Sequence, residues 1–315
     1  TGSLSADDRK SNNDEYQALT AELTRIAETT TFGGQKLLDG SYGTKAIQVG
    51  ANANETINLS LENVAANNIG SQQLKSVAIA PGAGTAAGDI VVTGNGQEGT
   101  YTVVAEDSAK TIASNLQGII GGLSATASTE AKFTVDDAAA TAAPASFTLT
   151  VGGASVEFKG VTSQAGLADQ LKSNAAKLGI SVNFDESKKT LEIKSDTGEN
   201  IVISDSTDPG SVSVAAKDGA GGYGAAVALA DDLIVTGQVS LDSAKGYSLS
   251  GAGVTGLFDA GAAASSTKVT IAETDVTDAT KAQNALAVID KAIGSIDSTR
   301  SNLGATQNRL TTTVD

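Results

Sequence analysis

The stretch that decides the fold is Ala279–Val314, which reads ATKAQNALAVIDKAIGSIDSTRSNLGATQNRLTTTV. Apolar residues recur along it at alternating spacings of three and four, and only Arg300 and Gln307 break the series while keeping its rhythm. Such spacing places one apolar stripe along a helix, and a run of about five heptads is typical of coiled coils. The predicted helix is about 54 Å long and cannot bury its stripe alone. The stripe consists of Ala279, Ala282, Leu286, Ile289, Ile293, Ile296, Leu303, Leu310 and Val314.

A second, shorter amphipathic helix is predicted near the start of the chain. The same spacing of three and four runs from Tyr16 to Thr30. Gly33 and Gly34 supply its stop. The candidate capping residues before it are Asp7, Asp8 and Asn12–Asn13.

Two heptad-patterned helices at opposite ends of a sequence most simply pack antiparallel, with the middle of the chain inserted between them. The first helix covers about half of the second, so Leu303, Leu310 and Val314 need another partner. Asp315 follows a stripe position without a stop signal, and the chain starts at Thr1 and contains no Met. We therefore expect either a truncated chain whose missing helix covers the stripe, or assembly with further copies.

Composition excludes several classes of function. The formal net charge of −15 argues against binding to nucleic acid or to an anionic membrane. The chain has no His and no Cys, which excludes the zinc sites and catalytic triads that need them. It contains no apolar run long enough to span a bilayer. We expect no enzyme activity, no cofactor and no metal.

A β-hairpin is predicted directly after the first helix. Apolar and polar residues alternate over residues 46–49 and 56–61, and a loop rich in Gly and Asn separates the two runs. In this region Arg25–Gly40 and Ile47–Ile57 resemble the helix and following hairpin of bacterial flagellin. Ala285–Ala292 and Arg300–Arg309 resemble the C-terminal core helix of the same family. The resemblance covers about a third of the chain, and two remote stretches agree in order.

This resemblance implies a secreted structural subunit of the bacterial flagellar filament, located outside the cell. Its partners would be other flagellin subunits, bound through terminal segments that this chain lacks. The family's conserved core surface is also the face that the innate Toll-like receptor recognises. The alternative from a different class is a cell-surface flagellin homologue that binds a polysaccharide or a host ligand, against which stands an aromatic content of only 3%.

The middle of the chain contains an internal repeat at an offset of about 55 residues. Each copy is predicted as a β-β-α-β-β unit, with Ser108 and Ser163 near the start of the two short helices. The first module spans residues 76–145 and the second 146–206, while residues 207–271 form hairpins that lead back to the core. The helical core then comprises residues 1–75 and 272–315. The predicted fold class is α+β: an antiparallel, coiled-coil-like helical core with a β-hairpin, and inserted β-rich outer domains.

Five polar residues are candidates for subunit or receptor contact. Glu22 and Arg25 lie one turn apart on the first helix, so they form either a simple ion pair or, by resemblance, part of the recognised surface. Arg300 and Gln307 interrupt the stripe, either as register-setting positions or as residues that face a neighbouring subunit. Arg309 closes the last stretch that resembles flagellin.

Two further motifs are more consistent with turns than with ligand sites. The glycines of residues 82–88 have the wrong spacing for a phosphate-binding loop, and no Lys follows them. Acidic pairs at residues 136–137, 205–208 and 231–232 offer oxygen ligands for calcium but lack the twelve-residue loop pattern.

Overall fold

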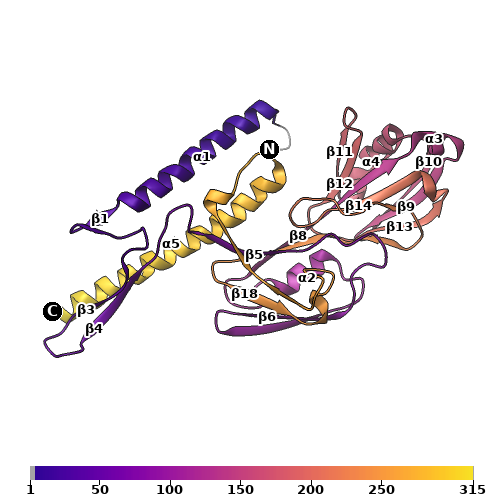
Figure 1. Ribbon diagram of the computed structural model, residues 1–315. Coiled ribbons are helices and arrows are strands. Elements are labelled where there is room, and N and C mark those ends of the chain that lie inside the picture. Colours follow the sequence, from indigo (N-terminus) through magenta and orange to yellow (C-terminus); the bar gives the residue numbers. More distant parts are fainter. Residues whose placement is uncertain (1–3, 315) are drawn as a thin grey trace. The chain divides into compact units, whose positions relative to one another are not determined.

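The computed structural model describes residues 4–314, without the side chains of Pro209 and Val314. The described chain divides into two compact units (Figure 1). Unit 1 is formed from residues 1–72, 242–245 and 267–315, and unit 2 from residues 73–241 and 246–266. The fold is α+β, with several antiparallel sheets.

Unit 1 is mainly helical. It contains α1 (Ala6–Thr29), the hairpins β1–β2 and β3–β4, strand β20, the short helix η3 and the long helix α5 (Ala279–Val314). The bounds of the smaller elements are β1 Thr31–Phe32, β2 Gln35–Lys36, β3 Gly43–Gln48, β4 Thr56–Leu61, β20 Thr267–Thr270 and η3 Ile271–Glu273. Strand β5 (Gly70–Lys75) crosses the boundary to unit 2.

Helix α1 is longer than the sequence pattern predicts. Its cap is Ser5, whose hydroxyl accepts a hydrogen bond from the Asp8 amide at 3.1 Å, while the Asp8 carboxylate accepts one from the Ser5 amide. The helix therefore has 24 residues, about 36 Å. Periodicity missed nearly three turns at its start, residues 6–15, because they are polar on almost all sides. Helix α5 has the predicted bounds. Just before its first turn, the Asp278 carboxylate accepts a hydrogen bond from the Lys281 amide at 2.8 Å.

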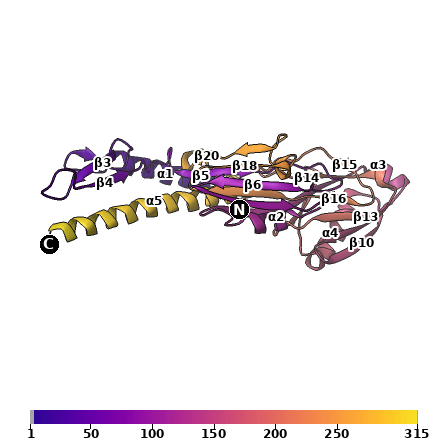
Figure 2. The same ribbon diagram turned by 90° about the horizontal axis from the view of Figure 1, so that it is seen from below.

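The two helices run in the same direction, so the predicted antiparallel arrangement is wrong (Figures 1 and 2). Asn13, near the start of α1, accepts the amide of Val276 at 3.1 Å, just before α5 begins. Further along, Ala27 of α1 shares a core with Val288 and Ala292 of α5. The long insertion between the helices removes the constraint of a short turn, which would have made them antiparallel.

A connecting segment fills the space that the two helices share. Residues 64–69 contribute four buried apolar side chains to the core, and the Thr24 hydroxyl on α1 accepts the Ala66 amide at 3.2 Å. Strand β4 lies against α5 in the same unit. The core of unit 1 is thus a layer of mostly small side chains between α1 and α5. The two helices do not pack directly on each other as a coiled coil along their length. The buried residues of the segment are Val64, Ala65, Ala66 and Ile69.

Unit 2 consists of antiparallel sheets with three helices. One sheet has the order β10-β9-β13-β16, and another the order β19-β18-β6-β7. In a third set, β11 pairs with β12, β12 with β8, and β14 pairs with the opposite edge of β8 and with β15. The bounds are β6 Gly88–Gly94, β7 Gln97–Val103, α2 Ala109–Leu116, β8 Ser124–Val135, α3 Asp137–Ala142, β9 Ala145–Val151, β10 Ala154–Val161, α4 Gln164–Leu178, β11 Ser181–Asp185, β12 Thr190–Ser195, β13 Ile201–Thr207, η1 Pro209–Ser211, β14 Val212–Ala216, β15 Val227–Ala228, β16 Leu233–Val235, β17 Gln238–Ser243, β18 Tyr247–Ser250, η2 Ala252–Val254 and β19 Ala263–Ser265.

The order β-β-α-β occurs twice in unit 2, as β6-β7-α2-β8 and as β9-β10-α4-β11. Ser108 and Ser163 cap α2 and α4, and each hydroxyl accepts a backbone amide three residues ahead, at 3.1 and 3.0 Å. The first copy differs from the predicted β-β-α-β-β unit, because β8 is one strand of 12 residues where two strands were expected. No Gly, Pro or Asn interrupts β8 to form the turn that two strands would need.

Strand β8 contributes to both apolar cores of unit 2. Its first half packs against the core around β6, α2 and β18, and its second half is part of the core around β9, β10 and α4. In the second core the ring of Phe147 stacks between Phe133 and Phe158, with centroid distances of 6.2 and 5.4 Å.

Candidate self-association surface

Uncovered apolar side chains are concentrated on unit 1. Among the described residues, eight large apolar side chains are exposed, and six of them belong to this unit although unit 2 has more residues. Every arginine of the chain also lies in unit 1, whereas the cations of unit 2 are all lysines. Exposed apolar patches mark interaction sites, and protein interfaces are enriched in aromatic residues, Met and Arg. The six are Leu19, Ile26, Phe32, Leu286, Ile293 and Leu303, and the two on unit 2 are Val77 and Val104.

Helix α5 has two distinct faces. The face buried within the chain is made of small residues, namely Ala285, Val288, Ala292, Thr299 and Thr306. The stripe predicted from the sequence lies mostly beside this face: Leu286 is 60% exposed and Ile293 is also exposed, whereas Ile289 is half-buried and Ile296 packs against the core. The expectation that α1 covers this part of the stripe is therefore wrong.

Leu303, Leu310 and Val314, at the end of α5, were expected to be uncovered, and the structure agrees only in part. Leu303 is 38% exposed, as an uncovered stripe requires, but Leu310 is half-buried. The side chain of Val314 lies outside the described residues. The uncovered surface is therefore not a short remainder at the end of α5, because it begins at Leu286.

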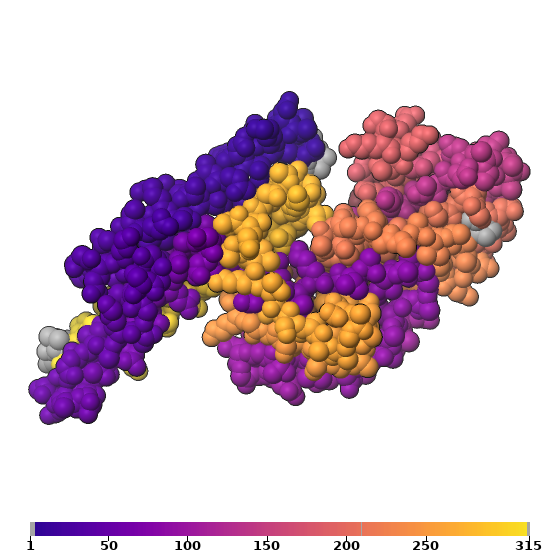
Figure 3. Space-filling model, viewed as in Figure 1, coloured from indigo at the N-terminus to yellow at the C-terminus, as the bar shows by residue number. Residues whose placement is uncertain are grey.

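Helix α1, like α5, has one side that is buried and another side with exposed apolar residues. Thr20 and Ala27 are buried, while Leu19 and Ile26, seven residues apart, are exposed on another side. In the space-filling view the indigo surface of α1 is open along its length (Figure 3). A helix with two apolar sides needs a second partner, because each exposed Leu or Ile side chain forfeits roughly 1.5–3 kcal/mol relative to full burial.

Glu22 and Arg25 form a two-point ion pair on the exposed side of α1. The guanidinium donates from Nε to Oε2 of Glu22 at 2.9 Å and from Nη2 to Oε1 at 2.6 Å. These hydrogen bonds lower the pKa of the Glu22 carboxyl below its usual value. The pair thus presents a fixed, planar polar group beside Leu19 and Ile26.

The three candidates on α5 do not form one cluster with that pair. Arg300 is exposed, and its Nη1 lies 3.6 Å from Oδ1 of Asp297 on the preceding turn. Gln307 follows Arg300 by seven residues on the same side as Leu286 and Ile293. Arg309 points to the opposite side of the helix from Arg300, since nine residues correspond to two and a half turns. Arg300 and Gln307 therefore belong to the exposed face of α5.

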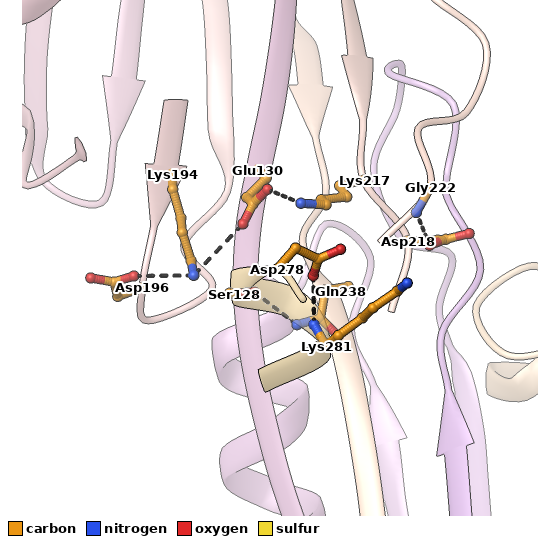
Figure 4. A network of polar contacts seen from close by, with 10 residues as sticks. All are labelled: Ser128, Glu130, Lys194, Asp196, Lys217, Asp218, Gly222, Gln238, Asp278 and Lys281. Atoms are coloured by element: carbon orange, nitrogen blue, oxygen red, sulfur yellow. Dashed lines mark hydrogen bonds and ion pairs between the residues drawn. The ribbon is translucent and has the colours of Figure 1, made fainter. Parts of the chain in front are cut away.

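Unit 2 has its own charged cluster, but its members satisfy one another (Figure 4). Glu130 on β8 contacts Lys217 at 2.5 Å and Lys194 at 3.6 Å, and Lys194 also lies 3.6 Å from Asp196. The ring of Tyr223 lies 4.7 Å from the ammonium of Lys132. These pairs join β8 to β12 and to Lys217, which follows β14.

The other motifs noted in the sequence have structural roles. Asp136 caps helix α3, where its carboxylate accepts hydrogen bonds from the Ala138 and Ala139 amides at 3.1 Å. Gly82 exchanges backbone hydrogen bonds with Ile234 at 3.1 and 2.8 Å, so its loop adds to a strand edge. Asp231 accepts the Ser206 amide at 2.6 Å. Within residues 4–314 no group of three or more acidic side chains is placed to hold a metal, and no helix is long and apolar enough to cross a membrane.

Known proteins similar to this chain are flagellins. The bacterial flagellin N-terminal helical region matches residues 1–43. The B-type flagellin of Pseudomonas aeruginosa is 43% identical over 333 residues, and the alignment covers all of this chain and 68% of that protein. Polar flagellin A of Vibrio parahaemolyticus is 28% identical over 309 residues, which cover 98% of this chain and 57% of the relative.

A solved structure, FliC from Burkholderia pseudomallei, aligns with 98% of this chain and 88% of its own. The sequence identity is 16% and the TM-score is 0.37, which is too low to carry an argument about the fold.

Proposed function

The chain belongs to the bacterial flagellin family, and we propose that unit 1 is the part through which its copies contact one another in the filament. Flagellin is the structural subunit of the flagellar filament and serves motility, so this chain is a filament component located outside the cell or at its surface. The observation that carries the proposal is the concentration of exposed apolar side chains on α1, α5 and the hairpin β1–β2.

We propose the following division of the chain. Residues 1–75 and 272–315 act as one discontinuous helical domain, supported by the shared core of α1, α5 and the segment between β4 and β5. Residues 76–145 and 146–206 are two β-rich modules that arose by duplication, which the recurring β-β-α-β order supports. Residues 207–271 lead back to the core. The coiled-coil-like contact of the stripe is made with a further helical segment, since α1 leaves Leu286 exposed.

Glu22, Arg25, Arg300, Gln307 and Arg309 are proposed as contact positions for neighbouring subunits. Their exposure supports this role, and so does the position of Arg300 and Gln307 on the same side of α5 as Leu286. Recognition of the same face by a Toll-like receptor is a second proposal that rests on the family resemblance. A glycan partner is not favoured.

Filament assembly tests the proposed function. In the complete flagellin we would replace Leu286 and Ile293 together by Asp, and in a control replace Val77 and Val104 of unit 2 in the same way. All four side chains are exposed, so neither double variant removes a buried contact within this chain. We expect the α5 variant to be secreted but not polymerised and the unit 2 variant to form normal filaments. Normal filaments from the α5 variant, seen by electron microscopy, would contradict the proposal.

A further inference from the structure

Unit 2 contains a cavity of about 370 Å³ where the starts of α3 and α4 meet the turn between β11 and β12. This volume falls within the range of sites that bind small molecules. All of the lining belongs to unit 2, so the cavity is complete within one chain. Its apolar part consists of Val135, Ala138, Ala165 and Phe184, and its polar part of Asp136, Asp137, Gln164, Glu186 and Lys189.

The helix starts beside the cavity are already capped by carboxylates of the chain. Asp136 accepts the amides of Ala138 and Ala139, both at 3.1 Å. Asp137 accepts the Gln164 amide at 2.9 Å. These amides are the donors that would hold an anion at a helix start, and they are used by the protein itself. The polar lining is therefore rich in oxygen acceptors, which suits a ligand that donates hydrogen bonds.

Gln164 provides one such acceptor from a buried position, since the residue is only 7% exposed. Its Nε2 donates to the Lys189 carbonyl at 2.7 Å and so fixes the turn between β11 and β12 to the start of α4. Its Oε1 has no hydrogen-bond partner among residues 4–314, and it is not one of the enclosed oxygens, so it faces the cavity that the residue lines. A donor placed in the cavity would satisfy this oxygen.

The charged side chains around the cavity favour a cation. Three carboxylates and one ammonium line it, so the lining is negative. Glu186 and Lys189 are both exposed, and within residues 4–314 neither has an ion-pair partner. Phe184 adds a half-buried ring, and the ammonium of Lys172 on α4 lies 5.6 Å from its centroid. The site thus combines acceptors, negative charge and an apolar wall.

We propose that this cavity binds a small organic cation, namely a short alkyl amine or diamine. The ammonium group donates to the carboxylates of Asp137 and Glu186 and to Oε1 of Gln164, and the alkyl chain lies against Val135 and Phe184. The ammonium of Lys189 competes with the ligand for the same negative charge. This binding activity is separate from filament assembly, because every residue of the site lies in unit 2.

The test is calorimetric titration of the complete flagellin monomer with putrescine, and with the uncharged butanediol of the same chain length. We expect putrescine to bind once per chain and butanediol not to bind. Glu186→Gln should weaken putrescine binding about tenfold, because it removes a charge-assisted hydrogen bond. Lys189→Gln should tighten it. The matched control Glu98→Gln, at an exposed carboxylate of β7, should leave it unchanged.

The side-chain amide of Gln164 reports the location of binding, and its nuclear magnetic resonance signal should shift during the titration. Equal weakening by Glu186→Gln and Glu98→Gln, or many putrescine molecules per chain, would indicate general attraction to a chain of net charge −15 and would overturn the inference. Equal binding of butanediol, weaker binding by Lys189→Gln, or an unshifted Gln164 signal would also contradict it. The measurements use the monomer, so failure of the proposed filament function would not affect them.

Discussion

Leu286 and Val288 lie two residues apart on α5 and have opposite environments. Val288 is fully buried against α1 and the segment between β4 and β5, whereas Leu286 is 60% exposed. Two residues correspond to about 200° around a helix, so the pair marks two sides of α5. One side is buried within this chain and the other is exposed.

Truncation of these two side chains should separate the two roles. Val288→Ala removes two buried methyl groups and should lower the free energy of unfolding by about 2 kcal/mol. Leu286→Ala should change it by less than about 0.5 kcal/mol, as exposed positions do. Chemical denaturation of the monomer followed by circular dichroism measures both. Equal losses for the two variants would mean that the two sides are not distinct.

Phe147 should be the most sensitive position of the second core in unit 2. Its ring stacks between those of Phe133 and Phe158, and all three are buried. Phe147→Ala should cost about 3–5 kcal/mol, because it leaves a large cavity between two rings. Phe147→Leu, which fills more of the space, should cost less. Thermal unfolding with a loss of near-ultraviolet aromatic signal provides the measurement.

Tyr101 makes unit 2 sensitive to alkali. Burial and then a hydrogen bond to Asp107 at 2.6 Å raise its pKa to about 12, from 10.0. Below pH 10 both the folded and unfolded states keep the phenol proton, and this contribution to stability is complete. Between pH 10 and 12 only the unfolded state loses the proton, so stability falls as pH rises.

The control for this effect is Tyr101→Phe, which lacks the titrating group and should show a smaller decline in stability over pH 10–12. Absorbance of tyrosinate at 295 nm should show a phenol that ionises near pH 12, and Tyr101→Phe should remove it. Identical pH profiles for the two proteins would contradict the assignment.

The helical domain should fold without unit 2. A protein in which residues 1–75 are joined to 267–315 by a short Gly/Ser linker keeps α1, α5 and the core that they share. It should be about half helical by circular dichroism and unfold cooperatively. A matched protein that starts its second part at residue 272 loses Val269 and the buried Ile271 and should unfold at a lower temperature. A random-coil spectrum for the longer protein would rule out an independent domain.

The sequence predicted where elements lie better than it predicted which sides they bury. The bounds of α5, the hairpin β3–β4 and the capping serines of α2 and α4 follow from local patterns that the structure reproduces. The buried side of α5 could not be predicted in this way, because residues 64–69 pack against small side chains such as Ala285 and Ala292, while the larger Leu286 and Ile293 are exposed.

The candidate site could be predicted only in part for a similar reason. The pairing of Glu22 with Arg25 follows from their spacing, and the structure has it. The exposure of Phe32 does not follow, because a Phe before two glycines reads equally well as the buried end of a helix. The direction of α1 relative to α5 depends on contacts such as Asn13 with Val276, which are remote in sequence and carry no local signal.

Strand β8 has a consequence for how unit 2 responds to load. Ala125 and Ala127 pack against one apolar core, and Phe133 and Val135 lie in the other, so one uninterrupted strand is embedded in both. Extracting the second half of β8 requires breaking its ladders with β12 and β14, and β17 is a further neighbour of β8 in the same sheet. A pulling force applied along β8 would therefore act on both apolar cores at once.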